Sequence, residues 1–419
     1  MTPDVKQRIE QFRRGELPEG YKKTSLGIVP ANWIETTLGE IYTERNEPGN
    51  NDLPLLMVSI HSGVSDGEVD EEDLPKKVKR IEDKSQYKHA MPGDLVFNMM
   101  RAWQGAIGSV RTEGMVSPAY IVAAPNDLVD PVFMDYYMKT PRMINMLHRQ
   151  SYGVTDFRLR LYWDSFSPIP CVLPPIEEQK RIAEILTAQD NLITLHQRKV
   201  TEYRRLKKVF LTEMFPAEGF EEPDLRFGGF AGAWEQRKFE DIADRASLMS
   251  SAAGLSRVEY EDIIPGVGLL NKDISQKVST KSGIIFRPGD VLYGKLRPYL
   301  HNWLLPSFYG LAVGDFWVLQ PRNIDSGFLY RLIQSTQFDN VANQSAGTKM
   351  PRADWNLVSK TEFAVPQSTN EQALIGQYFN DLDDLIILHQ REVELQQKKK
   401  KALMELLLTG ILKSIEENS

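Results

Sequence analysis

A ten-residue block occurs twice in this chain of 419 residues, as NLITLHQRKV at 191–200 and as DLIILHQREV at 384–393. The longer segments around it, 178–200 and 371–393, share 11 identical residues in 23 aligned positions. Such agreement is far above what unrelated segments would show by chance. An internal repeat constrains the fold more than any single motif, because both copies must adopt the same structure.

The similarity continues upstream of the repeated block. MPGDLVFNMMR at 91–101 matches RPGDVLYGKLR at 287–297, and GMVSPAYIVAAP at 114–125 matches GLAVGDFWVLQP at 310–321. A period of nearly 200 residues is too long for a solenoid. The sequence therefore predicts two copies of one domain, each followed by one copy of a shared segment.

Each shared segment is predicted to form a long helix. The first, from Glu178 to Phe215, contains neither Pro nor Gly and is ended by Pro216, while the second runs from about Glu371 to Thr409 before Gly410. Helices of this length would be about 55 Å long, and their apolar stripes favour an antiparallel pair. The stripe of the first comprises Ile182, Ile185, Leu186, Leu192, Ile193, His196, Val200, Tyr203, Leu206, Phe210 and Met214.

The domain before each helix is predicted to mix helices and strands. DLVFNMM and YIVAAP are typical of strands, and VFMDYYMKTPRMINMLHRQ has helical spacing interrupted at Pro141. The fold class is α+β: two similar mixed α/β domains separated by two long antiparallel, coiled-coil-like helices in a pseudo-two-fold cyclic arrangement. The segments are an N-terminal arm (1–30), a first domain (31–175), a central helix (176–215), a linker (216–232), a second domain (233–368) and a C-terminal helical segment (369–419).

A helix at about Pro3–Arg14 occupies the position of a helix end in this repeat, so the N-terminal arm is expected to pack near the C-terminal helix.

The composition of the chain is that of a globular protein, with 42% hydrophobic and 26% charged residues. The single cysteine, Cys171, excludes an internal disulfide. No apolar run is long enough to span a bilayer and the N-terminus lacks an apolar signal region, so we expect a cytoplasmic protein without a membrane partner.

No catalytic motif is evident. The chain lacks a phosphate-binding loop, a G-x-G-x-x-G turn before a helix, an adenine-methyltransferase motif and H-E-x-x-H. His196 and His389 lie on a mostly apolar helical column, which favours packed residues bonded through one ring nitrogen. A metal shared by the two is the alternative, although two histidines alone make a poor site. The basic runs 198–208 and 396–401 are typical of solvated helix faces, with contact to DNA or a partner as the alternative.

Three further motifs sit beside the repeat: PPIEEQKRIAEIL at 174–186, LKKVFLTEMFP at 206–216 and MELLLTGIL at 404–412. Together with the duplicated P-G-D domains, they resemble the specificity subunit of type I restriction–modification systems over essentially the whole chain. One departure is the second helix entry, VPQSTNEQ, which has one more residue before Glu371 than the first entry has before Glu178.

The resemblance implies a non-catalytic subunit that reads double-stranded DNA. Each domain would be a target-recognition domain for one half of a bipartite site, and the helices would set the gap between the halves. Two methylation subunits holding S-adenosylmethionine and further restriction subunits would attach, so S-adenosylmethionine, ATP and magnesium are expected on those partners and no cofactor on this chain. The alternative is a dumbbell-shaped scaffold that assembles proteins without reading DNA.

Residue types that contact base edges or phosphates suggest which side chains bind DNA. Arg101 aligns with Arg297, and Arg160 with Arg352, which favours phosphate contacts shared by both halves. The preferred DNA-facing loops are 151–158 and 345–352. The candidates in the first domain are Lys76, Lys77, Lys79, Arg80, Asn98, Arg101, Trp103, Gln104, Arg158 and Arg160; those in the second are Lys277, Lys281, Arg287, Lys295, Arg297, Tyr299, His301, Asn302, Lys349 and Arg352.

Overall fold

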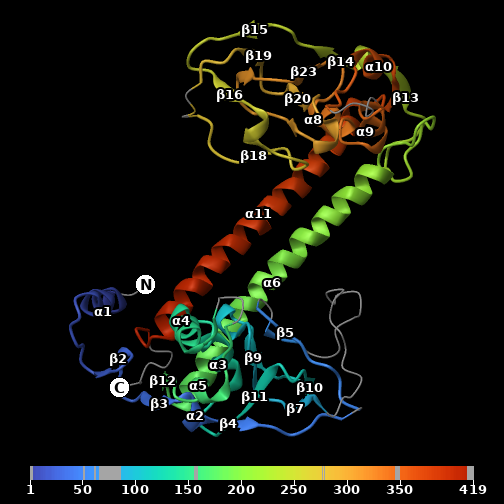
Figure 1. Ribbon diagram of the computed structural model, residues 1–419. Coiled ribbons are helices and arrows are strands. Elements are labelled where there is room, and N and C mark those ends of the chain that lie inside the picture. Colours follow the sequence, from blue (N-terminus) through green and yellow to red (C-terminus); the bar gives the residue numbers. More distant parts are fainter. Residues whose placement is uncertain are drawn as a thin grey trace. The chain divides into compact units, whose positions relative to one another are not determined.

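The computed structural model describes residues 3–50, 52–60, 63–65, 86–154, 159–275, 277, 279–344 and 350–412. The chain divides into two compact units: unit 1 comprises residues 1–194 and 394–419, and unit 2 comprises residues 195–393. Two long helices, α6 (Ile176–Glu213) and α11 (Thr369–Leu407), contribute one end to each unit (Figure 1). The predicted α+β class and both long helices are confirmed, although each helix begins and ends two residues before the predicted positions.

Unit 1 is built on an antiparallel sheet in the order β4-β11-β8-β9. Leu95 and Phe97 of its central strand share one buried cluster with side chains of α3, α4 and both long helices. The helices of unit 1 besides its ends of α6 and α11 are α1 (Pro3–Arg13), α2 (Leu38–Ile41), the 3-10 turn η3 (Ala102–Gln104), α3 (Pro131–Tyr137), α4 (Pro141–Gln150) and α5 (Trp163–Phe166). Its strands are β1 (Tyr21–Thr24), β2 (Gly27–Pro30), β3 (Ile34–Thr37), β4 (Tyr42–Arg45), β5 (Val58–Ser59), β6 (Gly63–Val64), β7 (Lys88–Ala90), β8 (Leu95–Asn98), β9 (Ile107–Ser109), β10 (Gly114–Val116), β11 (Tyr120–Pro125) and β12 (Pro170–Leu173).

Unit 2 repeats this order with β14-β23-β20-β21, and its pair β13-β24 repeats β3-β12. The predicted duplication of the domain is therefore confirmed at the level of strand pairing. The helices of unit 2 are α7 (Phe239–Ile242), the 3-10 turns η5 (Tyr260–Asp262) and η6 (Pro298–Leu300), α8 (Ser326–Leu332), α9 (Thr336–Ala342) and α10 (Trp355–Lys360). Its strands are β13 (Glu235–Lys238), β14 (Ala243–Arg245), β15 (Met249–Ser250), β16 (Ser256–Val258), β17 (Ile263–Ile264), β18 (Leu269–Leu270), β19 (Gly283–Phe286), β20 (Val291–Gly294), β21 (Trp303–Leu304), β22 (Gly310–Ala312), β23 (Phe316–Pro321) and β24 (Glu362–Val365).

A glutamate near the start of each long helix bonds to a tryptophan of the preceding domain. Glu178 accepts a hydrogen bond from Trp33 Nε1 at 3.2 Å, and Glu371 accepts one from Trp234 Nε1 at 3.3 Å. Both indoles are buried. Arg226 adds two hydrogen bonds to Glu371, at 2.6 and 2.8 Å. The repeated glutamate thus satisfies a buried donor in both units, which explains its identity in the two copies.

The glutamine that follows each glutamate fixes the neighbouring short helix. Gln179 Oε1 accepts from the backbone N–H of Asp130 at 2.9 Å, and Gln372 Oε1 accepts from that of Asp325 at 2.8 Å. These aspartates are the N-caps of α3 and α8. Each glutamine amide also donates to the carbonyl of a proline just before its helix. The additional residue in the second helix entry therefore leaves the contacts of the Glu-Gln pair unchanged.

Within each unit, segments of α6 and α11 pack against one another. Lys400 Nζ lies 2.6 Å from Asp190 in unit 1, and Lys207 Nζ lies 2.6 Å from Asp383 in unit 2. These two ion pairs occupy equivalent positions of the repeat. In unit 2 the chain numbers of contacting residues run in opposite directions, which confirms the antiparallel pairing there. The cyclic two-fold arrangement of the whole chain stays a prediction.

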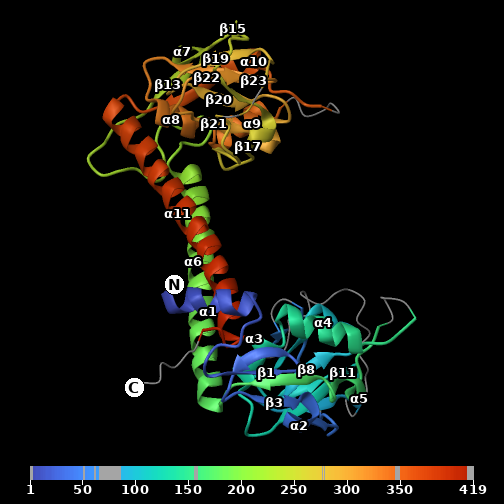
Figure 2. The same ribbon diagram turned by 90° about the vertical axis from the view of Figure 1, so that its left-hand side faces the viewer.

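The N-terminal arm packs beside the last residues of α11, as the repeat predicted (Figure 2). Arg8 Nη1 donates to the carbonyl of Ile411 at 2.9 Å, and Tyr21 Oη donates to the carbonyl of Gly410 at 2.9 Å. Gly410 has a φ of 71°, which is the left-handed conformation that favours glycine after a helix end. Both contacts lie inside unit 1.

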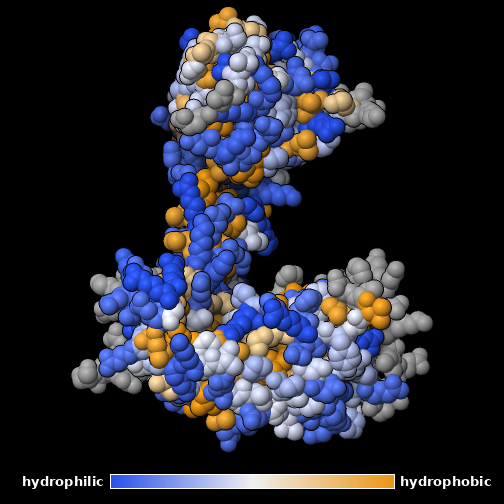
Figure 3. All heavy atoms as spheres, turned by 60° about the vertical axis from the view of Figure 1, so that its left-hand side comes forward, coloured by the Kyte–Doolittle hydropathy of each residue, from blue (hydrophilic) through white to orange (hydrophobic). Residues whose placement is uncertain are grey.

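Not every residue of the predicted apolar stripe is buried. Ile182, Leu186 and Val200 are buried, but Leu192 is 43% exposed, so its assignment to the packed side was wrong. Figure 3 shows hydrophobic atoms among hydrophilic ones along the helical segments. In the part of the chain that the structure describes, no helix is long and apolar enough to cross a membrane.

Candidate nucleic-acid interface

In both units, the turn after the central strand exposes an arginine. Arg101 follows β8 and precedes η3, and Arg297 follows β20 and precedes η6. Both arginines are exposed. Arg297 has a φ of 50°, and His301 at the other end of η6 has a φ of 55°. This left-handed geometry at both ends turns the short segment Arg297–His301 out of the sheet.

A second segment lies against each of these turns. In unit 1, Tyr152 and Arg160 exchange two backbone hydrogen bonds, and the N–H of Leu161 donates to Met99 at 2.8 Å. In unit 2, the N–H of Arg297 donates to Pro351 at 2.8 Å, and that of Ala353 donates to Lys295 at 2.8 Å. The described ends of the predicted loops 151–158 and 345–352 therefore lie beside the turns that carry the aligned arginines.

We name these paired segments surface 1 and surface 2. Surface 1 comprises 99–104, 152–154 and 160, and surface 2 comprises 295–301 and 350–352. Exposed apolar or aromatic side chains surround the arginines, which is a composition that can contact sugars and base edges as well as phosphates. The exposed set is Met100, Tyr152 and Val154 on surface 1, and Tyr299, Leu300 and Met350 on surface 2.

The cations of surface 2 are paired with an acid that surface 1 lacks. Asp315 lies 3.6 Å from Lys295 Nζ and 3.1 Å from an Nη of Arg352. The backbone N–H of Lys295 donates to the Asp315 carbonyl at 2.9 Å, and that of Met99 donates to the Ala119 carbonyl at 3.1 Å. Ala119 is therefore the structural equivalent of Asp315. Sequence reasoning missed Asp315, although the alignment of 114–125 with 310–321 places it opposite Ala119.

Two other candidate lysines of unit 2 belong to an ionic network. Lys277 Nζ lies 2.7 Å from Asp262 and 3.1 Å from Glu259, and Lys281 Nζ lies 2.6 Å from Glu259. The hydrogen bond from Lys281 is the main cause that lowers the pKa of Glu259. Burial raises the pKa of Asp262, but hydrogen bonds, led by that from Lys277, outweigh it and lower the pKa overall. These lysines are committed to carboxylates in the free chain.

Two more candidates of unit 2 make internal contacts. Asn302 is 5% exposed, so its side chain does not reach the surface and we remove it from the DNA-contact set. His301 Nε2 lies 2.9 Å from Asp339, and its ring stacks on Trp303 with centroids 4.9 Å apart. Through these contacts with Asp339 and Trp303, His301 fixes the end of the turn that forms surface 2. Arg287 borders β19 rather than surface 2.

The candidates of unit 1 divide in the same way. Gln104 and Arg160 are exposed on surface 1. Asn98 accepts a hydrogen bond from the N–H of Met100 at 2.9 Å, and Trp103 donates from Nε1 to the carbonyl of Met100 at 3.1 Å. Both therefore shape the turn that presents Arg101. The remaining candidates, Lys76, Lys77, Lys79, Arg80, Arg158 and Lys349, lie outside the described residues.

The repeated histidines pack against one another in unit 2. His196 Nδ1 lies 2.9 Å from His389 Nδ1, and Tyr203 stacks on His389 with ring centroids 5.6 Å apart. His389 is 9% exposed. The predicted packing role, with a bond through one ring nitrogen, is confirmed. Among the described residues, no cluster of three or more His, Cys, Asp or Glu side chains is placed to hold a metal ion.

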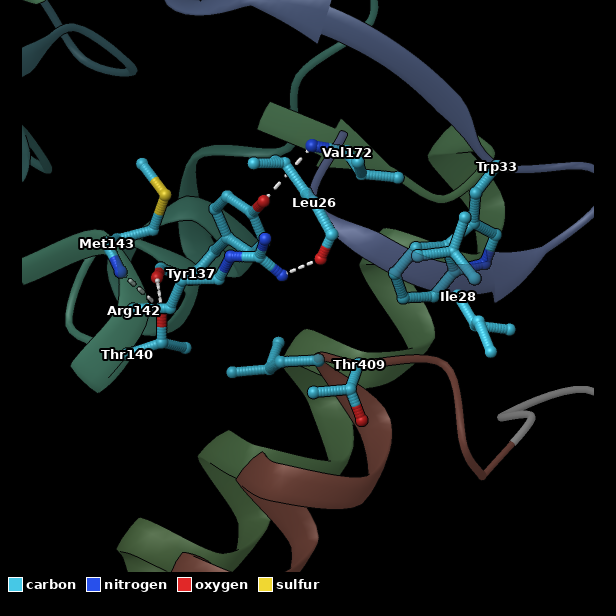
Figure 4. Close-up of a pocket in the computed structure, with 11 residues that line it drawn as sticks. Leu26, Ile28, Trp33, Tyr137, Thr140, Arg142, Met143, Val172 and Thr409 are labelled. Carbon is cyan, nitrogen blue, oxygen red and sulfur yellow. Dashed lines mark hydrogen bonds between the residues drawn. The ribbon is translucent and has the colours of Figure 1, made fainter. Parts of the chain in front are cut away.

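A small cavity of about 90 Å³ lies under the N-terminal arm in unit 1 (Figure 4). Leu26, Trp33, Met143 and Val172 give it a mainly apolar lining, and Arg142 donates from its guanidinium to the carbonyl of Leu26. This volume is well below the roughly 300–1,000 Å³ of typical ligand pockets. The cavity is thus a packing gap where the arm meets α4 and the end of α11.

The known proteins that resemble this chain are specificity subunits of type I restriction enzymes. No known protein-family profile matches it. The chain is 24% identical over 314 residues to the MjaVIII specificity subunit of a type I restriction enzyme from Methanocaldococcus jannaschii, across 68% of this chain and 71% of that protein. A second relative from that organism, provisionally assigned as the MjaX type I specificity subunit, is 22% identical over 429 residues, or 94% of this chain and 96% of the relative. The chain is thus similar to type I restriction enzyme specificity subunits over most of its length.

A solved specificity subunit has a similar fold. The type I restriction-modification S subunit from M. genitalium superposes with a TM-score of 0.50 at 12% identity, covering 92% of this chain and 97% of that one. At so low an identity, the likeness concerns the fold alone. In this chain, the contacts that repeat are those of Glu178, Gln179, Asp190 and their counterparts, whereas the charges on surfaces 1 and 2 differ.

Proposed function

We propose that this specificity subunit reads a bipartite double-stranded DNA target, with surface 1 contacting one half and surface 2 the other. The observation that carries the proposal is the duplicated surface itself. Arg101 and Arg297 occupy the same position in both units, while the residues around them differ. A shared arginine suits a phosphate contact common to both halves, and the divergent neighbours suit two different base sequences.

Individual roles follow from exposure and chemistry. Arg101 and Arg297 would hold phosphates, and Arg160 and Arg352 would hold the same strands from the adjacent segments. Gln104 and Tyr299, which lie within and next to the exposed turns, are the side chains that we assign to base edges. Lys295 would engage DNA after release from Asp315. Lys277 and Lys281, the lysines of the ionic network, would contribute to the electrostatic potential around surface 2.

We further propose that the chain directs the catalytic subunits of a type I complex without catalysing a reaction itself. Two methylation subunits holding S-adenosylmethionine would modify adenine in each half-site. Restriction subunits using ATP and magnesium would complete the assembly. The long helices would hold the two reading units at a fixed separation, so that target halves with a defined gap are selected.

The decisive experiment compares DNA reading with scaffolding. The full chain, purified with its methylation subunits, is expected to bind DNA with a sequence preference that genome-wide mapping of methyl-adenine would reveal. Replacing residues 31–173 by the same region of a relative should change one half of the methylated motif and leave the other half unchanged. An unchanged motif would support the scaffold and contradict DNA reading by unit 1.

Substituting the shared arginines tests their roles. Arg101→Ala and Arg297→Ala should each weaken binding to target and non-target DNA alike. Each should also lower the magnitude of the slope of log K against log salt by about 1, as expected when one phosphate contact is lost. Binding titrations at several salt concentrations measure both effects. A loss confined to the target sequence would instead make the arginine a base reader.

A further inference from the structure

A groove of about 460 Å³ opens in unit 2 beside surface 2. Arg204, Lys207 and Lys208 of α6 line one side of it. His301 and Trp303, which follow the exposed turn of surface 2, line another. Because His301 belongs to both surface 2 and the groove lining, the groove continues the candidate DNA interface onto the helix.

The acids of the groove are already engaged. Asp383 lies 2.6 Å from Lys207 Nζ and 2.8 Å from an Nη of Arg331. Asp339 lies 2.9 Å from His301 Nε2 and accepts a hydrogen bond from Asn343 at 2.9 Å. The carboxylates therefore fix neighbouring side chains and hold the groove wall in place.

Two cations of the groove make no ion pair with an acid of the described residues. Arg204 and Lys208 are exposed, and within the described part of the chain neither makes an ion pair. They stand four residues apart on α6, so they lie on the same side of the helix, about one turn apart. A like-charge pair at this spacing is unfavourable by itself. An anion between the two would relieve the repulsion.

The opposite side of the groove offers a donor without an acceptor. Trp303 is 7% exposed, and its Nε1–H makes no hydrogen bond within the described residues. A buried N–H that lacks an acceptor is costly. This N–H is enclosed in the groove wall, so the groups that an anion entering the groove would meet are the exposed cations of α6.

We propose that this groove binds the phosphate backbone of the DNA whose half-site surface 2 reads. Arg204 and Lys208 supply the charge, and the groove beside them connects with surface 2 at His301. The inference rests on the proposed DNA reading. It adds that α6 is a DNA contact as well as a spacer. The contacted phosphates flank the half-site, so the contact contributes affinity without base preference.

The test uses the full chain in complex with its methylation subunits. Arg204→Gln with Lys208→Gln is compared with a matched control, Arg198→Gln with Arg205→Gln. The control removes two exposed cations of the same helix that do not line the groove. Dissociation constants are measured on target and non-target duplexes over a range of salt concentrations, together with hydroxyl-radical footprints on the target.

The groove variant is expected to lower the magnitude of the salt slope by about 2, since two phosphate contacts are lost. Its sequence preference should be retained, and protection of the backbone beside one half-site should disappear. The control should change the slope by less than half as much. Equal slopes for the two variants, or an unchanged footprint, would overturn the proposal.

Two other outcomes separate the hypotheses. If the groove variant no longer assembles with the methylation subunits in size-exclusion chromatography, the groove docks a protein and the inference is wrong. If the unmodified complex shows no sequence preference, the proposed DNA reading fails. In that case the groove inference is still decided by the slope on non-target DNA.

Discussion

Unit 1 places Ala119 where unit 2 places Asp315, and Met99 where unit 2 places Lys295, so the two equivalent surfaces differ in charge. In unit 2 the carboxylate lies beside Lys295 and Arg352. In unit 1 the equivalent backbone contact, between Met99 and Ala119, carries no acid. The Glu-Trp and Gln-Asp contacts at the helix entries, by contrast, are the same in both units.

This comparison separates two kinds of position. Residues that join a domain to its long helix have retained their partners in both copies, because a buried donor or charge left without a partner is costly. Residues on the surfaces have diverged, because solvent-exposed side chains place few demands on folding. The four predictions below test the two kinds of position, beginning with the helix entries.

The largest effect is expected at a helix entry. Glu371→Ala removes the acceptor of Trp234 and of Arg226, and it should lower the free energy of unfolding of unit 2 by about 3 kcal/mol. Hydrogen exchange of unit 2 amides measures the loss locally, which suits a chain of two units. Asn370→Ala is the control, because Asn370 immediately precedes Glu371 in the same helix and is exposed. A loss as small as that of the control would show that the entry contact does not stabilise the unit.

A glycine contact present only in unit 2 should give the next largest effect. A Cβ on Gly376 would lie 2.9 Å from the carbonyl carbon of Gly327, so α8 and α11 approach closely there. Gly376→Ala should destabilise unit 2 by about 1–3 kcal/mol despite the better helix propensity of alanine. The aligned residue in α6 is the buried Ala183, and Ala183→Gly should cost about 1–2 kcal/mol through lower helix propensity and the loss of a buried methyl group. Thermal unfolding of the paired variants compares the two, and a stabilising Gly376→Ala would contradict the close packing.

Exchanging the surface acid should make the two units more alike. Asp315→Asn removes the negative charge beside Lys295 and Arg352, so non-target DNA should bind several-fold tighter and with a salt slope steeper by about 1. Ala119→Asp should have the opposite effect through surface 1. Salt titrations of the complex with its methylation subunits measure both variants. If Asp315→Asn and Ala119→Asp changed the salt slope in the same direction, positions 315 and 119 would not be functionally equivalent.

The smallest effect concerns the histidine pair. Burial lowers the pKa of His389, Lys199 and His196 lower it further, and Glu392 opposes them. Because the pKa in the folded state lies below the unfolded value of about 6.5, stability is greatest above that pH. It should fall by about 1 kcal/mol or less as the pH drops from that value to the pKa of the folded state. His389→Gln should flatten this dependence in urea unfolding between pH 8 and 5.5, and an unchanged pH profile would exclude His389 as its source.

Much of the fold followed from the repeat and from helix signals. The Pro-free, Gly-free run after Pro175 predicted the first long helix to within two residues, and Gly410 as a stop signal did the same for the second. The position of the first helix in the repeat predicted that the arm packs near the C-terminal helix. Leu192 was wrongly predicted to lie on the packed side of its helix. Periodicity identifies an apolar stripe on an isolated helix, but only the part of the stripe that faces the partner helix is buried when two helices pack.

The surfaces were harder to predict. Arg101 and Arg297 could be found by alignment, but residue type alone does not show that Lys277 is held by carboxylates or that Asn302 is buried. Those properties depend on residues elsewhere in the sequence, such as Glu259 and Asp262, which hold Lys277. The groove of α6 depends on the same long-range packing, so the basic run 198–208 gave no means to distinguish Arg204 from Arg205.

The division of the chain also affects its synthesis. Unit 2 is a continuous segment, whereas the core of unit 1 needs Leu403 and Leu407 of α11 and the following Leu408, which leave the ribosome only after the whole of unit 2. Unit 2 can therefore fold during translation, while unit 1 waits with part of its apolar surface uncovered. A chain interrupted before these leucines would contain a complete unit 2 and an unfinished unit 1. Chaperones and proteases that bind exposed apolar surface could thus remove truncated subunits before they enter an assembly.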